Sequence, residues 1–191
     1  MIAAFLNAEI NSKRFQGYIY KILTEKNINI DLITKPKLED LRENEIRYQI
    51  LTNYRGYGNR SALFENFPLL IDWYQVELDR EEIQKVKYIN YDYWNELSNN
   101  SRLGSEAAKN IKNGKIIFNQ PNDNFLEAAK SLKEGKTLPP LILVSKDKDS
   151  YLVAVEGNLR LTAYALEPEK IPDKSLAIVG FSSEINRWDL Y

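Results

Sequence analysis

From Glu81 onward, the chain alternates segments of strand type with segments of helix type. Residues 86–91 alternate apolar and polar side chains, whereas 141–144 and 151–155 are short apolar runs suited to buried strands. Stretches with helical spacing lie between and after these runs, and glycine or proline ends them. This alternation is typical of an α/β unit, so the sequence predicts a sheet packed with helices over residues 81–191.

The expected elements of this part follow one another closely. Gly114 and Gly135 stand where a glycine ends a helix, and Asn124 stands where an asparagine caps the start of one. A charged turn separates the runs 141–144 and 151–155, which predicts a hairpin or neighbouring strands. The predicted helices cover residues 93–98, 105–113, 125–133 and 161–166, and a last strand covers 176–181.

The first third of the chain has helical spacing instead. Residues 15–26 and 40–53 repeat apolar side chains at intervals of three and four, which predicts two helices. Residues 27–34, between them, alternate as a strand or an extended connection does. Aromatic side chains then gather between Phe64 and Tyr74, and we expect them to pack the helical part onto the rest of the chain.

These two sequence patterns define the predicted domains and the predicted fold class. We predict a mostly helical N-terminal region over residues 1–80 and an α/β domain over residues 81–191. The predicted fold class is α+β, a small mixed-sheet domain preceded by a helical extension. With 43% hydrophobic side chains, the 191 residues are enough to bury a core of this size.

The chain contains neither cysteine nor histidine. Disulfides, thiolate nucleophiles and cysteine-ligated metals are therefore excluded, as are Ser-His and Cys-His catalytic pairs. Proton transfer must come from Asp, Glu, Lys or Tyr. If a metal takes part, we expect Mg²⁺, bound by oxygen ligands beside a phosphate.

The charge is nearly balanced, with 26 basic and 27 acidic side chains. The chain therefore lacks the bulk attraction that dominates non-specific DNA binding, although a local basic patch remains open. No segment approaches the roughly 18 consecutive apolar residues of a membrane span, so we predict no membrane partner. The first residues have no basic leader and their apolar run is short, so we expect a cytoplasmic protein.

The turn Glu156-Gly157-Asn158-Leu159-Arg160 joins a predicted strand to a predicted helix. Gly157 lets the backbone approach a ligand closely, and the start of a helix presents unpaired N–H groups with partial positive charge. Arg160 can bind two phosphate oxygens at once. The turn thus has the chemistry of a phosphate site, although a helix-capping turn with a surface arginine has the same sequence.

This turn belongs to a longer pattern. A helix that ends at Gly135 precedes the proline-led run 139–144, a second apolar run follows, and the turn then opens a helix. The pattern resembles the ParB/sulfiredoxin superfamily over about half of the chain. The resemblance implies a sulfiredoxin-like fold for this half and a nucleotide ligand, ATP, ADP or CTP, accompanied by Mg²⁺.

Residue by residue, the resemblance is partial. Where phosphotransfer members have an acidic residue, glycine, two histidines and arginine, this chain has Glu156, Gly157, Asn158, Leu159 and Arg160. Asn158 stands where sulfiredoxins place the reactive cysteine, so sulfinic acid reduction is not implied. CTP-binding partition proteins have two consecutive arginines, and Leu159 replaces the first of them. The resemblance therefore implies ligand binding more directly than catalysis.

Two functions remain open at this point. The first is a nucleotide-binding enzyme of phosphoryl transfer or nucleotide hydrolysis, with Gly157 and Asn158 holding phosphate. In it, Glu156 would serve as acid/base or metal-orienting carboxylate and Arg160 would stabilise charge. The second is a non-catalytic ParB-like module that binds nucleotide, DNA or a protein partner, in the maintenance or defence of mobile DNA.

Four other residues are candidate ligand contacts. Arg102 lies where superfamily members often have an arginine or a polar loop that faces the nucleotide, although a solvated loop arginine is the alternative. Asn119 precedes a proline and is either a turn former or a ligand contact. Arg55 and Arg60 flank two glycines and two tyrosines, a loop composition that fits phosphate or nucleic-acid binding as well as protein docking.

The C-terminal residues Trp188 and Tyr191 have large aromatic rings, which an ordered segment is expected to bury. We expect these rings to pack on the helical part or on a second subunit. A homodimer is therefore among the predicted partners, together with a nucleotide, DNA or another protein.

Overall fold

The computed structural model describes residues 1–191 and divides the chain into two compact units, residues 1–69 and 70–191. The predicted α+β fold class is confirmed, with a five-stranded mixed sheet in the second unit. The predicted boundary at residue 80 falls inside this second unit. The reason is the strand Asp72–Leu78, which pairs along its whole length with a strand near the C-terminus.

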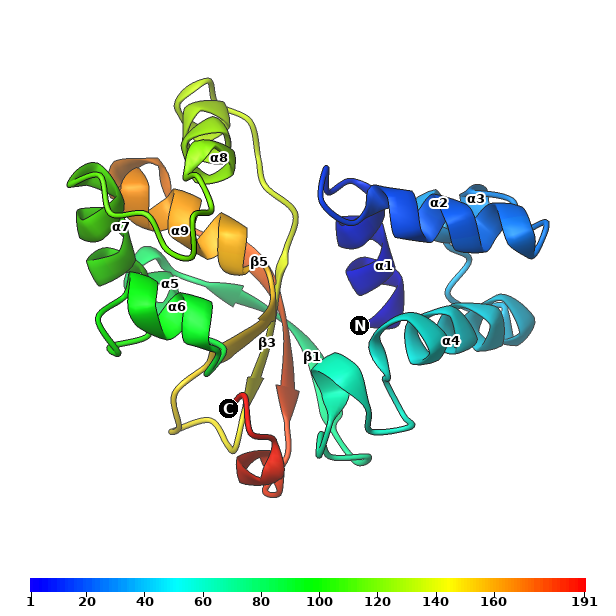
Figure 1. Ribbon diagram of the computed structural model, residues 1–191. Helices are drawn as coiled ribbons and strands as arrows, with labels where there is room; N and C mark the ends of the chain where they lie inside the picture. The colour runs from blue at the N-terminus through cyan, green and yellow to red at the C-terminus, as the bar shows by residue number, and fades with distance from the viewer. The chain divides into compact units, whose positions relative to one another are not determined.

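The first unit is helical (Figure 1). The predicted helices at 15–26 and 40–53 are confirmed as α2 and α4. The Asp40 carboxylate accepts hydrogen bonds from the N–H groups of Arg42 and Glu43, at 2.9 and 3.1 Å, and so caps α4. The helices of this unit are α1 (Ile2–Ile10), α2 (Gln16–Glu25), α3 (Asp31–Thr34), α4 (Leu41–Arg55) and the 3₁₀ turn η1 (Ala62–Phe64).

The strand or extended connection expected at 27–34 is wrong in its second half, where α3 forms. The side chain of Asn29 accepts a hydrogen bond from the Asp31 N–H at 2.9 Å, which favours a helical turn over an extended chain. The buried Arg47 of α4 then donates to the backbone oxygens of Leu32 and Lys37, at 2.8 and 2.9 Å. These bonds hold the α3 region against α4.

The second unit contains the sheet, whose strand order is β1-β5-β3-β4-β2. The pairs β1/β5 and β3/β4 are antiparallel, whereas β3/β5 and β2/β4 are parallel. The predicted hairpin is therefore confirmed as β3 and β4. The strands are β1 (Asp72–Leu78), β2 (Lys87–Tyr88), β3 (Leu141–Ser145), β4 (Val153–Glu156) and β5 (Ser175–Phe181).

Five helices accompany this sheet, and α7, α8 and α9 lie together on one side of it (Figure 1). Each predicted helix of this part is present, although α8 begins at Asp123 and is preceded by Asn122 rather than capped by Asn124. The helices are α5 (Arg80–Lys85), α6 (Asp92–Leu97), α7 (Gly104–Lys112), α8 (Asp123–Lys133) and α9 (Asn158–Leu166), with 3₁₀ turns η2 (Pro168–Lys170) and η3 (Ile185–Arg187).

The core of the second unit lies between the sheet and these helices. Alternate residues of the central strands face it, Leu141 and Leu143 from β3 and Ala177 and Val179 from β5. Each fully buried leucine stabilises the fold by about 1.5–3 kcal/mol through loss of apolar contact with water. This core fixes the end of β4 against the start of α9. None of the helices of either unit has both the length and the apolar character that crossing a bilayer requires.

Candidate phosphate-binding turn

Gly157 forms the tight connection between β4 and α9. Its φ of 109° lies in the left-handed region that side chains rarely adopt. A Cβ atom here would lie 2.6 Å from Cδ2 of Leu141 and 2.9 Å from Nη2 of Arg160. The turn therefore requires glycine for both its backbone angle and its close packing, and it places the guanidinium of Arg160 beside the backbone.

The start of α9 has no side-chain cap. Its first backbone hydrogen bond runs from the Leu161 N–H to the Gly157 oxygen at 2.8 Å. The N–H groups of Asn158, Leu159 and Arg160 have no protein acceptor. Because the Leu159 side chain is exposed, this end of the helix borders solvent. Unpaired N–H groups and the helix dipole favour an anion at such a position.

Arg160 is only 9% exposed, and its guanidinium already has an anionic partner. Nη2 donates to the carboxylate of Glu156 and to the backbone oxygen of Pro140, the latter at 3.0 Å. The buried Nε has no hydrogen-bond partner. An incoming phosphate would therefore meet an arginine whose Nη2 is already paired with a carboxylate.

Asn158 contributes its backbone N–H to the turn but directs its side chain elsewhere. The amide oxygen accepts a hydrogen bond from the Ile89 N–H at 3.4 Å, and the amide nitrogen donates to the Ala154 oxygen at 3.2 Å. The side chain thus ties the turn to β4 and to the segment after β2. This geometry makes Asn158 a positioning residue rather than a side-chain ligand of phosphate.

Arg102 binds the other side of the same peptide group that Asn158 contacts. Its Nε donates to the Tyr88 oxygen at 2.9 Å, so the Tyr88–Ile89 peptide is held between Arg102 and Asn158. The remaining nitrogens donate to the backbone oxygens of Leu190 and Tyr191. Burial lowers the pKa of Arg102 below its usual value. The guanidinium thus donates to three backbone oxygens of this unit.

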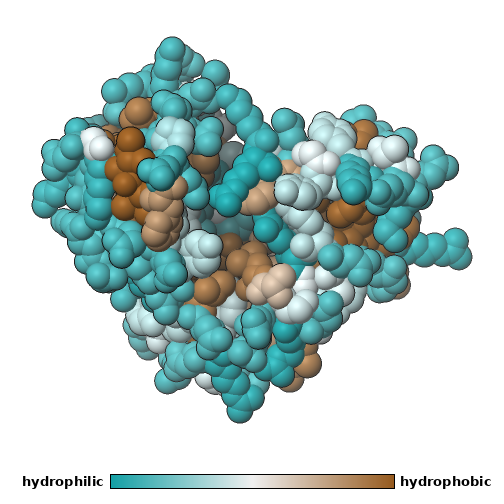
Figure 2. Space-filling model, in the orientation of Figure 1, coloured by the Kyte–Doolittle hydropathy of each residue, from teal (hydrophilic) through white to brown (hydrophobic).

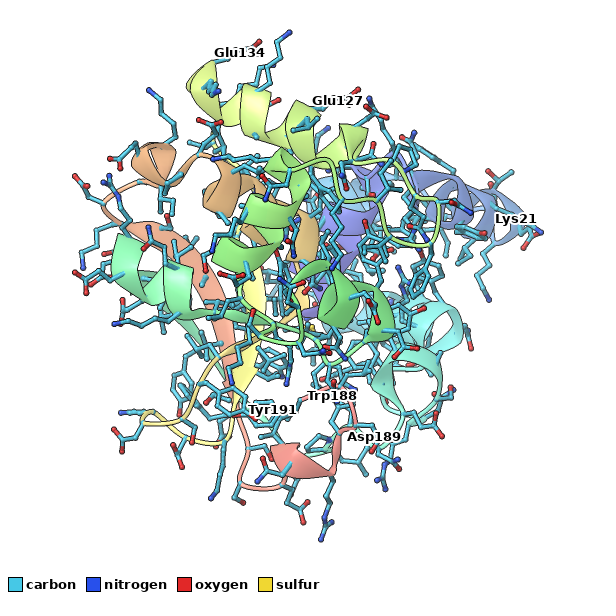
Figure 3. All side chains as sticks on the ribbon, turned by 60° about the vertical axis from the view of Figure 1, so that its left-hand side comes forward. Lys21, Glu127, Glu134, Trp188, Asp189 and Tyr191 are labelled. Atoms are coloured by element: carbon cyan, nitrogen blue, oxygen red, sulfur yellow. The ribbon has the colours of Figure 1, made fainter.

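The ring of Tyr191 packs within the second unit rather than on the helical part, whereas the expected packing on a second subunit stays a prediction. Trp188 is buried, and the Tyr191 ring stacks on Tyr151 with centroids 4.7 Å apart. The Tyr191 hydroxyl donates to the Tyr151 oxygen at 3.0 Å. Figure 3 labels Trp188 and Tyr191 on this segment at the lower end of the sheet. Arg102 is the side chain that anchors the backbone of this segment.

Asn119 lies in the connection between α7 and α8. Phe118 and Asn119 have φ values of 49° and 56°, and the Gln120 N–H donates to the Ile117 oxygen at 2.9 Å, which closes a tight turn. Asn119 is exposed, and no hydrogen bond links it to the Gly157 turn. Asparagine tolerates positive φ better than other side chains, which accounts for its presence here without a ligand.

Arg55 belongs to the first unit and pairs with a buried carboxylate. Its Nη2 lies 2.7 Å from each carboxylate oxygen of Glu9, which is 3% exposed. The Tyr54 hydroxyl donates to the same carboxylate at 2.7 Å. The guanidinium also lies 4.2 Å from the Phe15 ring centroid and 4.5 Å from that of Tyr54. Arg55 and Tyr54 are thus engaged inside the unit.

Arg60 is exposed on the loop after α4 and has a φ of 54°. The Tyr57 ring of this loop packs edge-on against Phe64, with centroids 5.0 Å apart, rather than projecting outward for base stacking. Of the two arginines and two tyrosines that the sequence singled out here, only Arg60 projects freely to solvent.

Sequence reasoning did not identify Glu9 as the partner of Arg55. One signal was present, because Glu9 is the only charged residue of the otherwise apolar segment 2–10. A lone carboxylate on a buried helix requires a donor, since an unpaired buried charge is costly. Nothing in the local sequence indicates that the donor lies on α4.

The structure contains no group of three or more carboxylates placed to hold a metal. A Mg²⁺ carried by a nucleotide needs fewer protein ligands than such a group supplies. The two best-formed hollows, of about 90 and 520 Å³, are both lined by residues of the first unit. Neither includes the Glu156–Arg160 turn.

No protein-family model, no curated protein and no solved structure matches this chain.

Proposed function

We propose that residues 70–191 bind a nucleotide through a phosphate group at the Glu156–Arg160 turn. One observation carries the proposal: three consecutive backbone N–H groups at the start of α9 have no acceptor and border solvent. Gly157 adds a backbone without a side chain, and the guanidinium of Arg160 adds a positive charge beside it. Together these groups match the charge and hydrogen-bonding needs of a phosphate.

In this proposal Glu156 is an internal anion that a phosphate replaces. The carboxylate pairs with Arg160 when no ligand is bound. A phosphate carries more charge and can also use the N–H groups at the helix start, so it competes with Glu156 for the arginine. The displaced carboxylate is then a candidate ligand for Mg²⁺ that arrives with the nucleotide.

The ParB/sulfiredoxin resemblance remains part of the proposal. The succession of α8, β3, β4, the glycine turn and α9 supports it, because the resemblance calls for these elements in this order. Phosphoryl transfer or hydrolysis of ATP, ADP or CTP is the catalytic extension, with Glu156 and Arg160 at the reacting phosphate. The pairing of these two residues with each other favours binding over catalysis.

A second candidate is the non-catalytic module with a protein partner. Ile116 and Phe118, on the α7–α8 connection, are 58% and 61% exposed. Figure 2 shows an apolar patch on the side of the molecule where α7 and α8 lie in Figure 1. Phe118 also has a positive φ, which is costly for a bulky side chain. Exposed apolar patches of this kind mark protein interaction sites.

Calorimetric titration with nucleotides and Mg²⁺ tests the first proposal on three variants. Glu156→Gln removes the competing anion and is expected to tighten nucleotide binding about tenfold when Mg²⁺ is left out, with a smaller gain when Mg²⁺ is present because the carboxylate ligand is lost. Arg160→Gln is expected to weaken it by at least the same factor. Lys133→Gln, which breaks a surface pair with Glu167 at 2.9 Å, is the matched control and should change nothing.

The proposal fails if no nucleotide binds either the wild type or Glu156→Gln.

If a nucleotide binds, radiolabelled ATP separates the two functions, because an intact label after long incubation favours the non-catalytic module. Phe118→Ser tests the protein-partner version, and Leu176→Ser, which changes another exposed apolar residue, is its control. If only Phe118→Ser loses the partner, the contact lies at the α7–α8 connection. A gel shift at physiological salt with wild type and Arg60→Ala tests DNA binding at the one arginine of the loop that remains exposed.

A further inference from the structure

The loop after α4 closes over a small hollow in the first unit, which the nucleotide proposal does not use. Its volume is about 90 Å³, and no charged side chain lines it. Three of its six lining residues are aromatic. The lining residues are Tyr48, Tyr57, Gly58, Phe67, Pro68 and Leu69.

The glycines and tyrosines of this loop shape the hollow. At Gly58, with a φ of 83°, a Cβ atom would lie 1.9 Å from the hydroxyl oxygen of Tyr48. Only glycine therefore lets the Tyr48 ring lie against the loop backbone. The Thr52 hydroxyl donates to the Tyr57 oxygen at 2.6 Å and fixes the opposite wall.

The three rings meet at steep angles rather than in a stack. Tyr48 and Tyr57 have centroids 5.9 Å apart and planes inclined by 74°, and Tyr57 and Phe67 are 6.3 Å apart and inclined by 56°. Phe67 is buried, whereas Tyr48 lies partly exposed at the rim. All three rings line the hollow, and their planes are inclined to one another as neighbouring walls are.

The size and lining of the hollow restrict what it can bind. An apolar cavity of about 150 Å³ accepts benzene, so this smaller one suits a head group of only a few heavy atoms. The faces of aromatic rings carry negative partial charge, and several rings around one point attract a cation that is weakly hydrated. We propose that Tyr48, Tyr57 and Phe67 bind a methylated ammonium group.

Choline and 3,3-dimethyl-1-butanol give a matched test, because the two have the same shape and only choline is charged. The full chain is titrated with each while the ring resonances of its tyrosines are followed by NMR. Choline is expected to shift these resonances in a saturable way and to bind at least about fivefold more tightly than the neutral compound. Equal affinity for the two would reduce the site to an apolar hollow and overturn the proposal, as would the absence of saturable shifts.

Variants at the exposed rim locate the binding without disturbing the buried floor. Tyr48→Phe keeps the ring and is expected to retain choline binding, whereas Tyr48→Leu keeps apolar volume and is expected to lose most of it. Gly58→Ala displaces the Tyr48 ring and should weaken binding as well. Full choline affinity in a folded Tyr48→Leu variant would contradict the proposal.

Discussion

Each of the two units contains an arginine paired with a largely buried glutamate, Arg55 with Glu9 in the first and Arg160 with Glu156 in the second. The first pair joins helices α1 and α4, whose residues are 46 positions apart, whereas the second spans four positions around one turn. The surroundings of the two pairs differ more than the pairs themselves.

Around Arg55 the neighbouring groups are already engaged with one another. Glu9 accepts from both Arg55 and Tyr54, and the guanidinium lies against the rings of Phe15 and Tyr54. Around Arg160, three helix N–H groups next to the pair have no acceptor. An arginine beside glycine predicts ligand binding in either sequence, and the Nε of each arginine is buried without a hydrogen-bond partner. Only the second arginine, however, lies next to helix N–H groups that have no acceptor.

Removal of the Glu9 carboxylate is the strongest test of the difference between the surroundings of Arg55 and those of Arg160. Glu9→Gln leaves the Arg55 charge without its partner inside the first unit, so we expect a loss of about 4 kcal/mol in unfolding free energy. Urea denaturation measures it. Glu25→Gln is the control, because it breaks an exposed pair with Lys21 and should cost less than about 0.5 kcal/mol. Similar losses in both variants would mean that Arg55 is not committed to a structural pair.

Gly157→Ala tests whether the second turn is as constrained as its geometry requires. The positive φ and the contacts with Leu141 and Arg160 together should cost about 3 kcal/mol. Gly135→Ala provides the matched control, since Gly135 has a φ of 82° but open space around it, and should cost only about 1 kcal/mol. Thermal denaturation of both variants measures the difference. Equal costs would show that the turn adapts and that its close packing adds little.

The elements that the sequence predicted are those whose signal is local. Helices α2 and α4 and the hairpin β3/β4 follow from apolar spacing within single segments. Strand β1 was not predicted, because its seven residues are mostly exposed and lack a clear alternation. Its existence depends on pairing from Asp72 with Phe181 to Leu78 with Ser175, which no local pattern reveals.

The same distinction applies to the candidate site. The glycine turn, its helix and the position of Arg160 were predictable because they lie within five consecutive residues. The partners that define the chemistry were not all visible, since the Pro140 oxygen and the Ile89 N–H come from other elements. Glu156 was visible, but its pairing with Arg160 depends on how the chain bends at Gly157.

Arg102 sharpens the comparison from a third position, because its guanidinium donates to three backbone oxygens rather than to a carboxylate. Arg102→Met keeps the apolar stem and removes the bonds to Tyr88, Leu190 and Tyr191, so we expect a loss of about 2 kcal/mol. Hydrogen exchange of residues 185–191 should increase more than that of β3. If Arg102→Met instead weakens nucleotide binding without releasing this segment, Arg102 faces the ligand as the resemblance implies.

The smallest expected effect is a pH dependence of the first unit. Burial and the hydrogen bond to the Glu9 carboxylate raise the pKa of Tyr54 above its ordinary value of about 10. Because the pKa is raised in the folded state, the hydroxyl of Tyr54 contributes its full stabilisation below about pH 10. This contribution declines as the pH rises above that value. The difference in unfolding free energy between wild type and Tyr54→Phe should therefore shrink between about pH 9 and 11, as measured by urea denaturation. If the free-energy difference between the two proteins stays constant over this range, the Tyr54 hydroxyl is not held by Glu9. Arg55 would then not share its carboxylate with Tyr54, and its surroundings would resemble those of Arg160 more closely.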